Sequence, residues 1–320
     1  MNPKILILSS VYDFSCDLVC LKLNDFGIPF VRINREYLKD YAISLDPIVP
    51  ILHVYGKNID AEIGSELKSV WFRQPIFLRN TPPFPLSPEE QLERSQWTAF
   101  IRALSVFDSA NWMNYPKATY LAESKPYQLL TAKRCGLKVP QTMVGNSIDA
   151  IKTKFSHKII IKSLDTVLIR EGTDCLFTYT TISNLSELTD QNLSSAPLLA
   201  QEILSSKVDI RITIVGKKLF SVRILSGNMG IEGDWRVLPK EKLEYENIQL
   251  NSEIEKSILK LTEVLGLSFA AVDLVETPDG TYFIEVNPTG EWGWLCNSDR
   301  KIDLAIASWL SDPGSEIEGL

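Results

Sequence analysis

The chain has 320 residues, a length that allows two or three domains with separate cores. Apolar residues make up 45% and charged residues 23%, as in ordinary soluble proteins, and no apolar run suggests a membrane span. The start is too polar for a signal peptide, and the five cysteines lack paired spacing, so neither disulfides nor a zinc site is expected. The net charge of −7 argues against general nucleic-acid binding, although it is compatible with a local basic pocket. We therefore expect a cytoplasmic protein whose partners are neither membranes nor nucleic acids.

The N-terminal third has the pattern of an α/β unit. Apolar runs predict strands at Ile5–Leu8 and Ile28–Ile33, with helix-spaced apolar residues between them, and Val70–Arg73 predicts a further strand. The opening lacks the glycine fingerprint of dinucleotide sites, so it is assigned no cofactor. Ser87–Glu90 has the capping-box pattern of a helix start. We place the first domain boundary near residue 115.

The middle of the chain is rich in strands. Lys125 opens a helix that is predicted to run to Cys135, before Gly136. His157–Ser163 predicts a strand in which Lys162 follows three isoleucines. Charge is unusual in a plain core strand, but taken alone Lys162 would be a strand-end lysine in solvent. Further strands are predicted at Leu176–Thr181, Leu198–Leu204, Val208–Val215 and Leu219–Leu225.

The last two of these strands form a predicted hairpin with an arginine on each strand. Alternation places Asp209 and Arg211 on one face and three isoleucines on the other. A three-residue loop puts Arg211 opposite Arg223. Two facing guanidinium groups repel each other unless an anion bridges them, and phosphate oxygens match their planar donors. A structural ion-pair ladder, in which Asp209 pairs with an arginine on its own face, is the alternative.

A second predicted hairpin, Phe269–Glu276 with Thr281–Asn287, carries oxygen donors. With an odd number of loop residues, Asp273 faces Glu285, and two facing carboxylates favour a cation between them. Two carboxylates and the carbonyl of Asn287 are hard ligands that suit Mg²⁺. The alternative is a solvated strand face with ordinary surface acids, and an even loop would separate the two carboxylates.

The C-terminal segments add one more candidate. Arg236, in a glycine-containing loop, is a third candidate contact to an anion. Ser252 is predicted to cap a helix with an apolar stripe that ends at Gly266. A last helix is predicted at Ile302–Leu310, and residues 311–320 are expected to form a flexible tail.

The order of these features resembles the ATP-grasp carboxylate ligases over about residues 116–295. Lys125 precedes a helix, Lys162 lies on a strand, and Gln201 and Glu202 end another, before the Asp-x-Arg strand and the Asp and Glu-x-Asn hairpin. Within that superfamily the segments SVWFRQP, VDIRITIVGKKLFSVRI, GDWR and FIEVNPTGEWGWL look most like the graspetide (microviridin-type) peptide maturases. That family usually has glutamine where this chain has Glu291, so we leave Glu291 outside the candidate site.

This resemblance implies an α/β (α+β) ATP-grasp fold. A Rossmann-like N-terminal domain, residues 1–115, would precede two α+β subdomains that clasp ATP, residues 116–204 and 205–310, with a tail at 311–320. It also implies a role for each candidate residue. Lys125 and Lys162 would hold the nucleotide phosphates, and Asp209 would contact the ribose. The border of the adenine would be formed by Gln201, Glu202, Ile203 and Leu204. The Mg²⁺ ligands would be Asp273, Glu285 and Asn287. The transferred phosphoryl group and the acyl-phosphate would be surrounded by Arg211, Arg223 and Arg236.

The activity implied is ATP-dependent activation of a carboxylate. An Asp or Glu side chain of a ribosomally made precursor peptide, with a leader and an acidic core, would attack the γ-phosphate of ATP with Mg²⁺ present. A Ser or Thr hydroxyl, or a Lys amine, would then attack the acyl-phosphate and give an ω-ester or an amide crosslink. The resemblance also suggests a homodimer. The alternatives are an ATP-grasp ligase for an amino acid, a small peptide or a protein C-terminus, and a catalytically silent nucleotide- or peptide-binding protein.

Overall fold

The computed structural model describes residues 2–73, 85–165, 168–171, 174–177, 180–189 and 195–314. Gln74 and Pro75 of the SVWFRQP segment lie outside the described residues, and so do residues 315–320 of the predicted tail. Within the described ranges, none of the helices combines the length and the apolar character needed to cross a bilayer.

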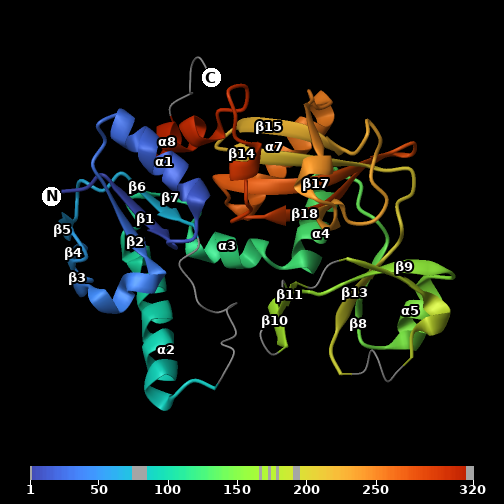
Figure 1. Cartoon of the computed structure of the whole chain (residues 1–320), viewed down its shortest axis with the longest axis horizontal. Helices are drawn as coiled ribbons and strands as arrows, with labels where there is room; N and C mark the ends of the chain where they lie inside the picture. Colours follow the sequence, from blue (N-terminus) through green and yellow to red (C-terminus); the bar gives the residue numbers. More distant parts are fainter. Residues whose placement is uncertain are drawn as a thin grey trace.

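A parallel sheet forms the N-terminal unit, blue in Figure 1. Its strands lie in the order β2 (Phe30–Asn34), β1 (Ile5–Ser9), β6 (Ser69–Phe72) and β7 (Asn111–Met113). The three predicted strands of this region are confirmed as β1, β2 and β6. The region between β2 and β6, for which no strand was predicted, holds the antiparallel strands β3 (Ala42–Asp46), β4 (Ile51–Gly56) and β5 (Ile59–Ile63).

Two helices of this unit begin at caps that their sequences encode. Helix α1 (Phe14–Asp25) starts after Asp13, whose carboxylate accepts from the backbone N–H of Cys16. Helix α2 (Pro88–Ala103) confirms the predicted capping box, because Ser87 and Glu90 each accept from the other's backbone N–H, at 3.2 and 2.8 Å.

A small antiparallel sheet follows in the chain. Its order is β12 (Thr181–Asn184), β9 (Lys158–Lys162), β13 (Leu198–Gln201) and β8 (Thr142–Gly145), and α5 (Ile148–Lys154) packs on it. Strand β9 confirms the prediction around Lys162. Strands β10 (Leu168–Glu171) and β11 (Asp174–Phe177) form a separate hairpin. The predicted strand Leu176–Thr181 instead covers the end of β11 and the first residue of β12, and residues 178–179 lie outside the described ranges.

The largest sheet carries most of the candidate residues. Its order is β16 (Glu244–Asn247), β15 (Lys218–Leu225), β14 (Val208–Val215), β17 (Phe269–Thr277) and β18 (Gly280–Asn287). Helices α4 (Lys125–Arg134) and α7 (Ser252–Leu265) cover one face, where Leu129 and Ile258 share a core with Ile210 and Leu274. Gly266 ends α7 in the left-handed conformation, as predicted, but the cap is Asn251 and not Ser252.

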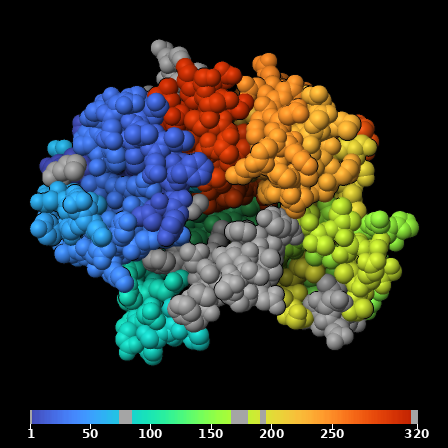
Figure 2. Space-filling view, viewed as in Figure 1, coloured from blue at the N-terminus to red at the C-terminus, as the bar shows by residue number. Residues whose placement is uncertain are grey.

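The C-terminal helix returns to the N-terminal unit. Ile306 and Leu310 of α8 (Ile302–Ser311) share one core with Ile5 of β1, Trp71 of β6 and Phe269 of β17. Figure 2 shows the red C-terminal residues between the blue N-terminal residues and the orange residues of the C-terminal half. This shared core holds the start of β17 next to the parallel sheet.

The remaining elements of the described residues are α3 (Pro116–Ala122) and the 3₁₀ turns η1 (Arg35–Asp40), η2 (Leu104–Val106), η3 (Leu185–Glu187), η4 (Trp235–Val237), η5 (Lys240–Lys242) and η6 (Gly293–Leu295).

Candidate functional site

The β17–β18 hairpin brings its two acids together. Asp273 lies directly opposite Glu285, the pairing that was predicted for a loop with an odd number of residues. The predicted odd loop is wrong, however, because Thr277 pairs with Gly280 and leaves a two-residue turn. The register shifts next to Asp273, where Ile284 is the extra residue of a bulge. The bulge therefore supplies the one-residue shift that was assigned to the loop.

Buried amides from outside the hairpin fix its position. Gln128 of α4 donates to the carbonyl of Val286 at 2.8 Å and accepts from its N–H at 3.0 Å, so it pairs the free edge of β18. Asn114 accepts from the N–H groups of Ser268 and Phe269 and donates to the carbonyl of Pro288, at 2.8, 2.8 and 2.9 Å. Both side chains are buried. Neither residue was among the predicted site residues, because their partners are more than 150 residues away in the chain.

Arginines hold the two acids. Arg236 Nη2 lies 2.7 Å from an oxygen of Asp273 and 3.1 Å from an oxygen of Glu285. Arg211 Nη1 contacts both oxygens of Asp273, at 2.9 and 3.0 Å, from the neighbouring strand. Burial would raise the pKa of Asp273, but Arg211 and Arg236 outweigh it and lower that pKa. Burial would likewise lower the pKa of Arg236, but Asp273, Glu285 and Asp234 raise it.

The predicted pairing of Arg211 with Arg223 is wrong. Gly216 and Lys217 form a two-residue turn, so Arg211 lies opposite Val222 and Arg223 lies opposite Ile210. Since cross-strand partners share a face, Arg223 is on the face that α4 and α7 cover. Its guanidinium pairs with Glu276 at 2.9 Å. Arg211 and Arg236 meet at the acids, and Arg223 does not join them.

A pocket lies beside these acids, between the small and the large sheets. The empty space in it, including the solvent at its mouth, is about 630 Å³. Apolar side chains form part of its wall: Ile160 and Ile182 from the small sheet, Val275 from β17 and the bulged Ile284 from β18. The predicted residues Lys162, Gln201, Glu202, Ile203, Leu204, Asp209 and Arg236 all line it. Asp234, which was not predicted, lines it too and caps η4.

The charged residues of this pocket are partly desolvated. Lys162 donates to the side chain of Gln201 at 3.2 Å, and burial lowers the pKa of Lys162. Burial raises the pKa of Asp209, and the ion pair with Lys207 offsets only part of that rise. The alternative expected Asp209 to pair with an arginine; among the described residues its ion pair is with Lys207 instead. Arg211 does form an ion pair with a carboxylate, but with Asp273 on the neighbouring strand.

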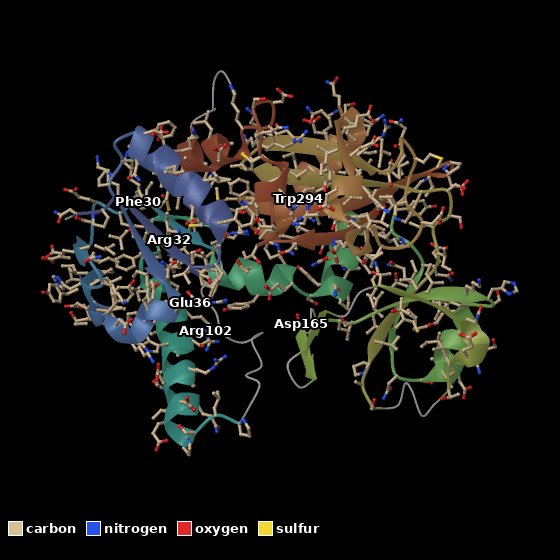
Figure 3. The ribbon with its side chains drawn as sticks, viewed as in Figure 1. Phe30, Arg32, Glu36, Arg102, Asp165 and Trp294 are labelled. Carbon is tan, nitrogen blue, oxygen red and sulfur yellow. The ribbon has the colours of Figure 1, made fainter. Side chains whose placement is uncertain are left out.

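A smaller pocket adjoins strand β18. Lys125, Asp165, Glu285 and Asn287 line it, and Lys125 donates to the carbonyl of Ser163 at 2.8 Å. Figure 3 labels Asp165, which comes from the side of the small sheet. Glu285 therefore lies next to both pockets. This arrangement places one predicted phosphate-binding lysine, Lys125, beside the predicted metal ligands.

Aromatic residues support the loop that carries Arg236. Trp294 contacts Trp235 and Tyr245, with ring centres 5.6 and 4.9 Å apart, and Figure 3 labels it among the side chains of the large sheet. Arg236 lies over the ring of Trp235, at 4.9 Å from its centre. A single sequence does not predict these ring contacts, because Trp294 lies far along the chain from Trp235 and Tyr245.

The donor set of the hairpin fits Mg²⁺. Asp273, Glu285 and Asn287 share one face, because the first two are cross-strand partners and Asn287 follows Glu285 by two residues. Throughout the described ranges, no group of three or more His, Cys, Asp or Glu side chains could form a complete metal cage. Two carboxylates and an amide suit an ion that takes its other ligands from water and phosphates, which is the habit of Mg²⁺.

Comparison with known proteins decides the family. Residues 123–310 match the model of the RimK-like ATP-grasp domain. The chain belongs to the RimK-like ATP-grasp family. This membership confirms the predicted resemblance to the ATP-grasp ligases and the predicted fold class.

Solved ATP-grasp structures resemble this chain over nearly its whole length. A RiPP-associated ATP-grasp ligase from Chryseobacterium gregarium, in complex with ADP and a leader and core peptide, superposes with a TM-score of 0.84 at 23% identity, and 98% of each chain is covered. Macrocyclase MdnC of Microcystis aeruginosa MRC, bound to precursor peptide MdnA, has a TM-score of 0.79 at 24% identity, with 96% of this chain and 99% of MdnC covered. At these identities the likeness concerns the fold, which includes the N-terminal unit.

Several curated glutamate ligases match shorter stretches of the chain. A tetrahydromethanopterin:alpha-L-glutamate ligase from Methanocaldococcus jannaschii is 33% identical over 84 residues, which are 26% of this chain and 28% of that enzyme. The chain also spans less than two thirds of the length of two further alpha-L-glutamate ligases.

Proposed function

We propose that this ATP-grasp chain is an ATP-dependent ligase that crosslinks a ribosomally made precursor peptide. It activates Asp or Glu side chains as acyl-phosphates and joins them to hydroxyl groups or amines. The observation that carries the proposal is the continuity of the fold: the N-terminal unit, the pocket and the acid hairpin together superpose on ligases solved with precursor, leader or core peptides. ADP, phosphate and a crosslinked peptide are the products.

The chain's own residues have separate tasks in this reaction. Ile160, Ile182, Val275 and Ile284 form an apolar slot for the base, and Asp209 accepts from the ribose. Lys162 and Lys125 hold the phosphates from the two pockets. Arg236 balances charge as the phosphoryl group moves to the peptide carboxylate.

Mg²⁺ is the proposed metal. Asp273, Glu285 and Asn287 would hold it, and it would neutralise phosphate charge when bound. Arg211 is buried and already contacts Asp273, so we now assign it to holding that ligand and not to contacting the phosphoryl group. The domain boundaries, the homodimer and the cytoplasmic location remain predictions.

A mass-spectrometric assay tests the proposal. The purified chain is incubated with ATP, Mg²⁺ and a leader-plus-core peptide encoded beside it, with a core dense in Asp or Glu and in Ser, Thr or Lys. We expect the peptide to lose one water per crosslink while ADP accumulates. A core peptide whose acids are all replaced by amides is the control and should stay unmodified. ATP consumption that only free amino acids stimulate would refute the peptide substrate.

A ligase for a free amino acid is the second candidate. The local similarity to an alpha-L-glutamate ligase favours it. It requires the same pocket and metal ligands, and it differs in the acceptor. In the same assay it predicts addition of the mass of an amino-acid residue to an acceptor, in place of water loss.

A further inference from the structure

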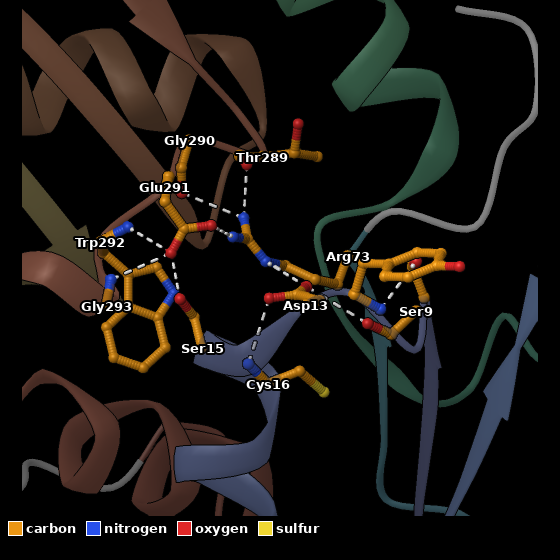
Figure 4. Close-up of polar contacts among 12 residues, drawn as sticks. Ser9, Asp13, Ser15, Cys16, Arg73, Thr289, Gly290, Glu291, Trp292 and Gly293 are labelled. Carbon is orange, nitrogen blue, oxygen red and sulfur yellow. Dashed lines mark hydrogen bonds and ion pairs between the residues drawn. The ribbon is translucent and has the colours of Figure 1, made fainter. Parts of the chain in front are cut away.

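Arg73, at the end of β6, is buried between two acids. Its guanidinium contacts Asp13 through Nε at 3.0 Å and Glu291 through Nη2 at 2.9 Å, and only 1% of the Arg73 side chain is exposed. Nη1 donates to the backbone carbonyls of Thr289 and Gly290 (Figure 4). Nη1 and Nη2 therefore fix the loop after β18 to the N-terminal unit, while Nε pairs with Asp13 inside that unit.

The second carboxylate oxygen of Glu291 holds its own loop. It accepts from the backbone N–H groups of Trp292 and Gly293, at 3.2 and 3.1 Å, and from the hydroxyl of Ser15 in α1 (Figure 4). A Cβ at Gly293 would lie 2.3 Å from the Ser15 oxygen, so this contact requires glycine. One side chain thus joins β6, the first turn of α1 and the loop.

The backbone of Glu291 reaches the acid hairpin. Its carbonyl accepts from Arg211 Nη2 at 3.0 Å, while Arg211 Nη1 contacts Asp273. The loop lies directly on the sheet here, because a Cβ at Gly290 would be 2.3 Å from the Cβ of Ala271. Arg211 Nε is buried without a hydrogen-bond partner among the described residues. The carbonyl of Glu291 and the carboxylate of Asp273 are therefore the contacts that orient this guanidinium.

We propose that Glu291 is a positioning residue for the metal ligand Asp273. Its carboxylate, held by Arg73, fixes the carbonyl that orients Arg211, and Arg211 in turn aligns Asp273. The inference rests on the proposed function, because it needs Asp273 to bind Mg²⁺. Partners that orient a metal ligand typically change metal affinity by about 10- to 100-fold when they are removed.

The test measures how ADP affinity depends on Mg²⁺, by calorimetry in Mg²⁺ and in EDTA. Glu291→Ala should weaken binding of ADP with Mg²⁺ by about 10-fold or more and leave metal-free ADP binding within about threefold of wild type. Ser15→Ala is the matched control, since it removes one of the contacts to the same carboxylate and should behave as wild type. Glu291→Gln has a single acceptor oxygen and cannot accept from both Arg73 and the loop N–H groups, so its affinity should lie between those of wild type and Glu291→Ala.

Each other outcome counts against a specific claim. An unchanged Mg²⁺ dependence in Glu291→Ala overturns the inference, and so does an equal loss with and without metal, which is the result of a purely structural role. If Glu291→Ala does not fold, Glu291→Asp decides by the same criterion, because its shorter side chain cannot reach both Arg73 and the loop N–H groups. A wild-type chain that binds no ADP with Mg²⁺ would refute the proposed function itself.

Discussion

Asp273 and Glu285 face each other across β17 and β18, and one guanidinium nitrogen of Arg236 lies within 3.1 Å of both carboxylates. A single cationic group can therefore contact the two acids at once. Like charges placed opposite each other destabilise a sheet unless a cation lies between them. The pair is thus a suitable place for a divalent ion, provided that Arg236 shares or gives up its contacts when the ion binds.

Glu285→Gln should abolish most metal-dependent turnover. The amide keeps the shape of the side chain and its contact distance to Arg236, but it is a poorer ligand for a hard cation. We expect ADP release with substrate present to fall by about 100-fold or more, with an unchanged melting temperature. Glu276→Gln on the same hairpin is the control and should keep nearly full turnover, because Glu276 pairs with Arg223 on the other face. Equal turnover in both variants would refute the metal assignment.

Local patterns were sufficient to predict the strands and helices that carry the site. The hairpin of Asp273 and Glu285, the strand with Lys162 and the helix that begins at Lys125 were all predicted from short segments. Register was harder, because a shift of one residue moves every following side chain to the other face. The turn at Gly216 and Lys217 and the bulge at Ile284 each change register by one residue.

Long-range contacts within the site were not predictable from this single sequence. Gln128 pairs with the edge of β18 across 158 residues, and Arg73 reaches Glu291 across 218. Neither side chain has a distinctive local pattern. Resemblance to a family supplied the pocket residues, but it also placed Arg223 in the site, where the observed register does not put it.

Arg223→Ala and Arg236→Ala should separate the two faces of the sheet. Arg236 contacts both acids and lines the pocket, so its loss should reduce turnover by about 100-fold. Arg223 contacts Glu276 in a half-exposed ion pair, so its loss should change turnover by less than about threefold and stability by less than about 1 kcal/mol. Steady-state ADP release and urea denaturation measure the two effects. A large loss of turnover in Arg223→Ala would return this residue to the site.

Gln128→Leu should destabilise the fold and loosen the metal hairpin. The substitution leaves the buried N–H and carbonyl of Val286 without their side-chain partner, at a cost of roughly 2–4 kcal/mol. Gln91→Leu is the control, since Gln91 also donates to a backbone carbonyl but from an exposed position, and it should cost less than about 0.5 kcal/mol. Urea denaturation gives both values. A cost below about 1 kcal/mol for Gln128→Leu would show that water can replace this contact.

Lys162→Met should weaken nucleotide binding and raise stability. Burial lowers the pKa of Lys162 from its ordinary value of 10.5, so the charged form is less favourable in the folded chain than in the unfolded one. As far as Lys162 is concerned, the free energy of unfolding is highest above pH 10.5 and falls as pH drops through the lower folded-state pKa of this lysine. At pH 7 the charged lysine therefore destabilises the fold. Lys162→Met should therefore melt at a higher temperature than wild type at pH 7, and the difference should shrink as pH rises toward 10.5. Calorimetry should show at least about tenfold weaker ADP binding, because the variant lacks a charge-assisted hydrogen bond to phosphate. Lower stability together with unchanged ADP affinity would mean that Lys162 serves the fold and not the nucleotide.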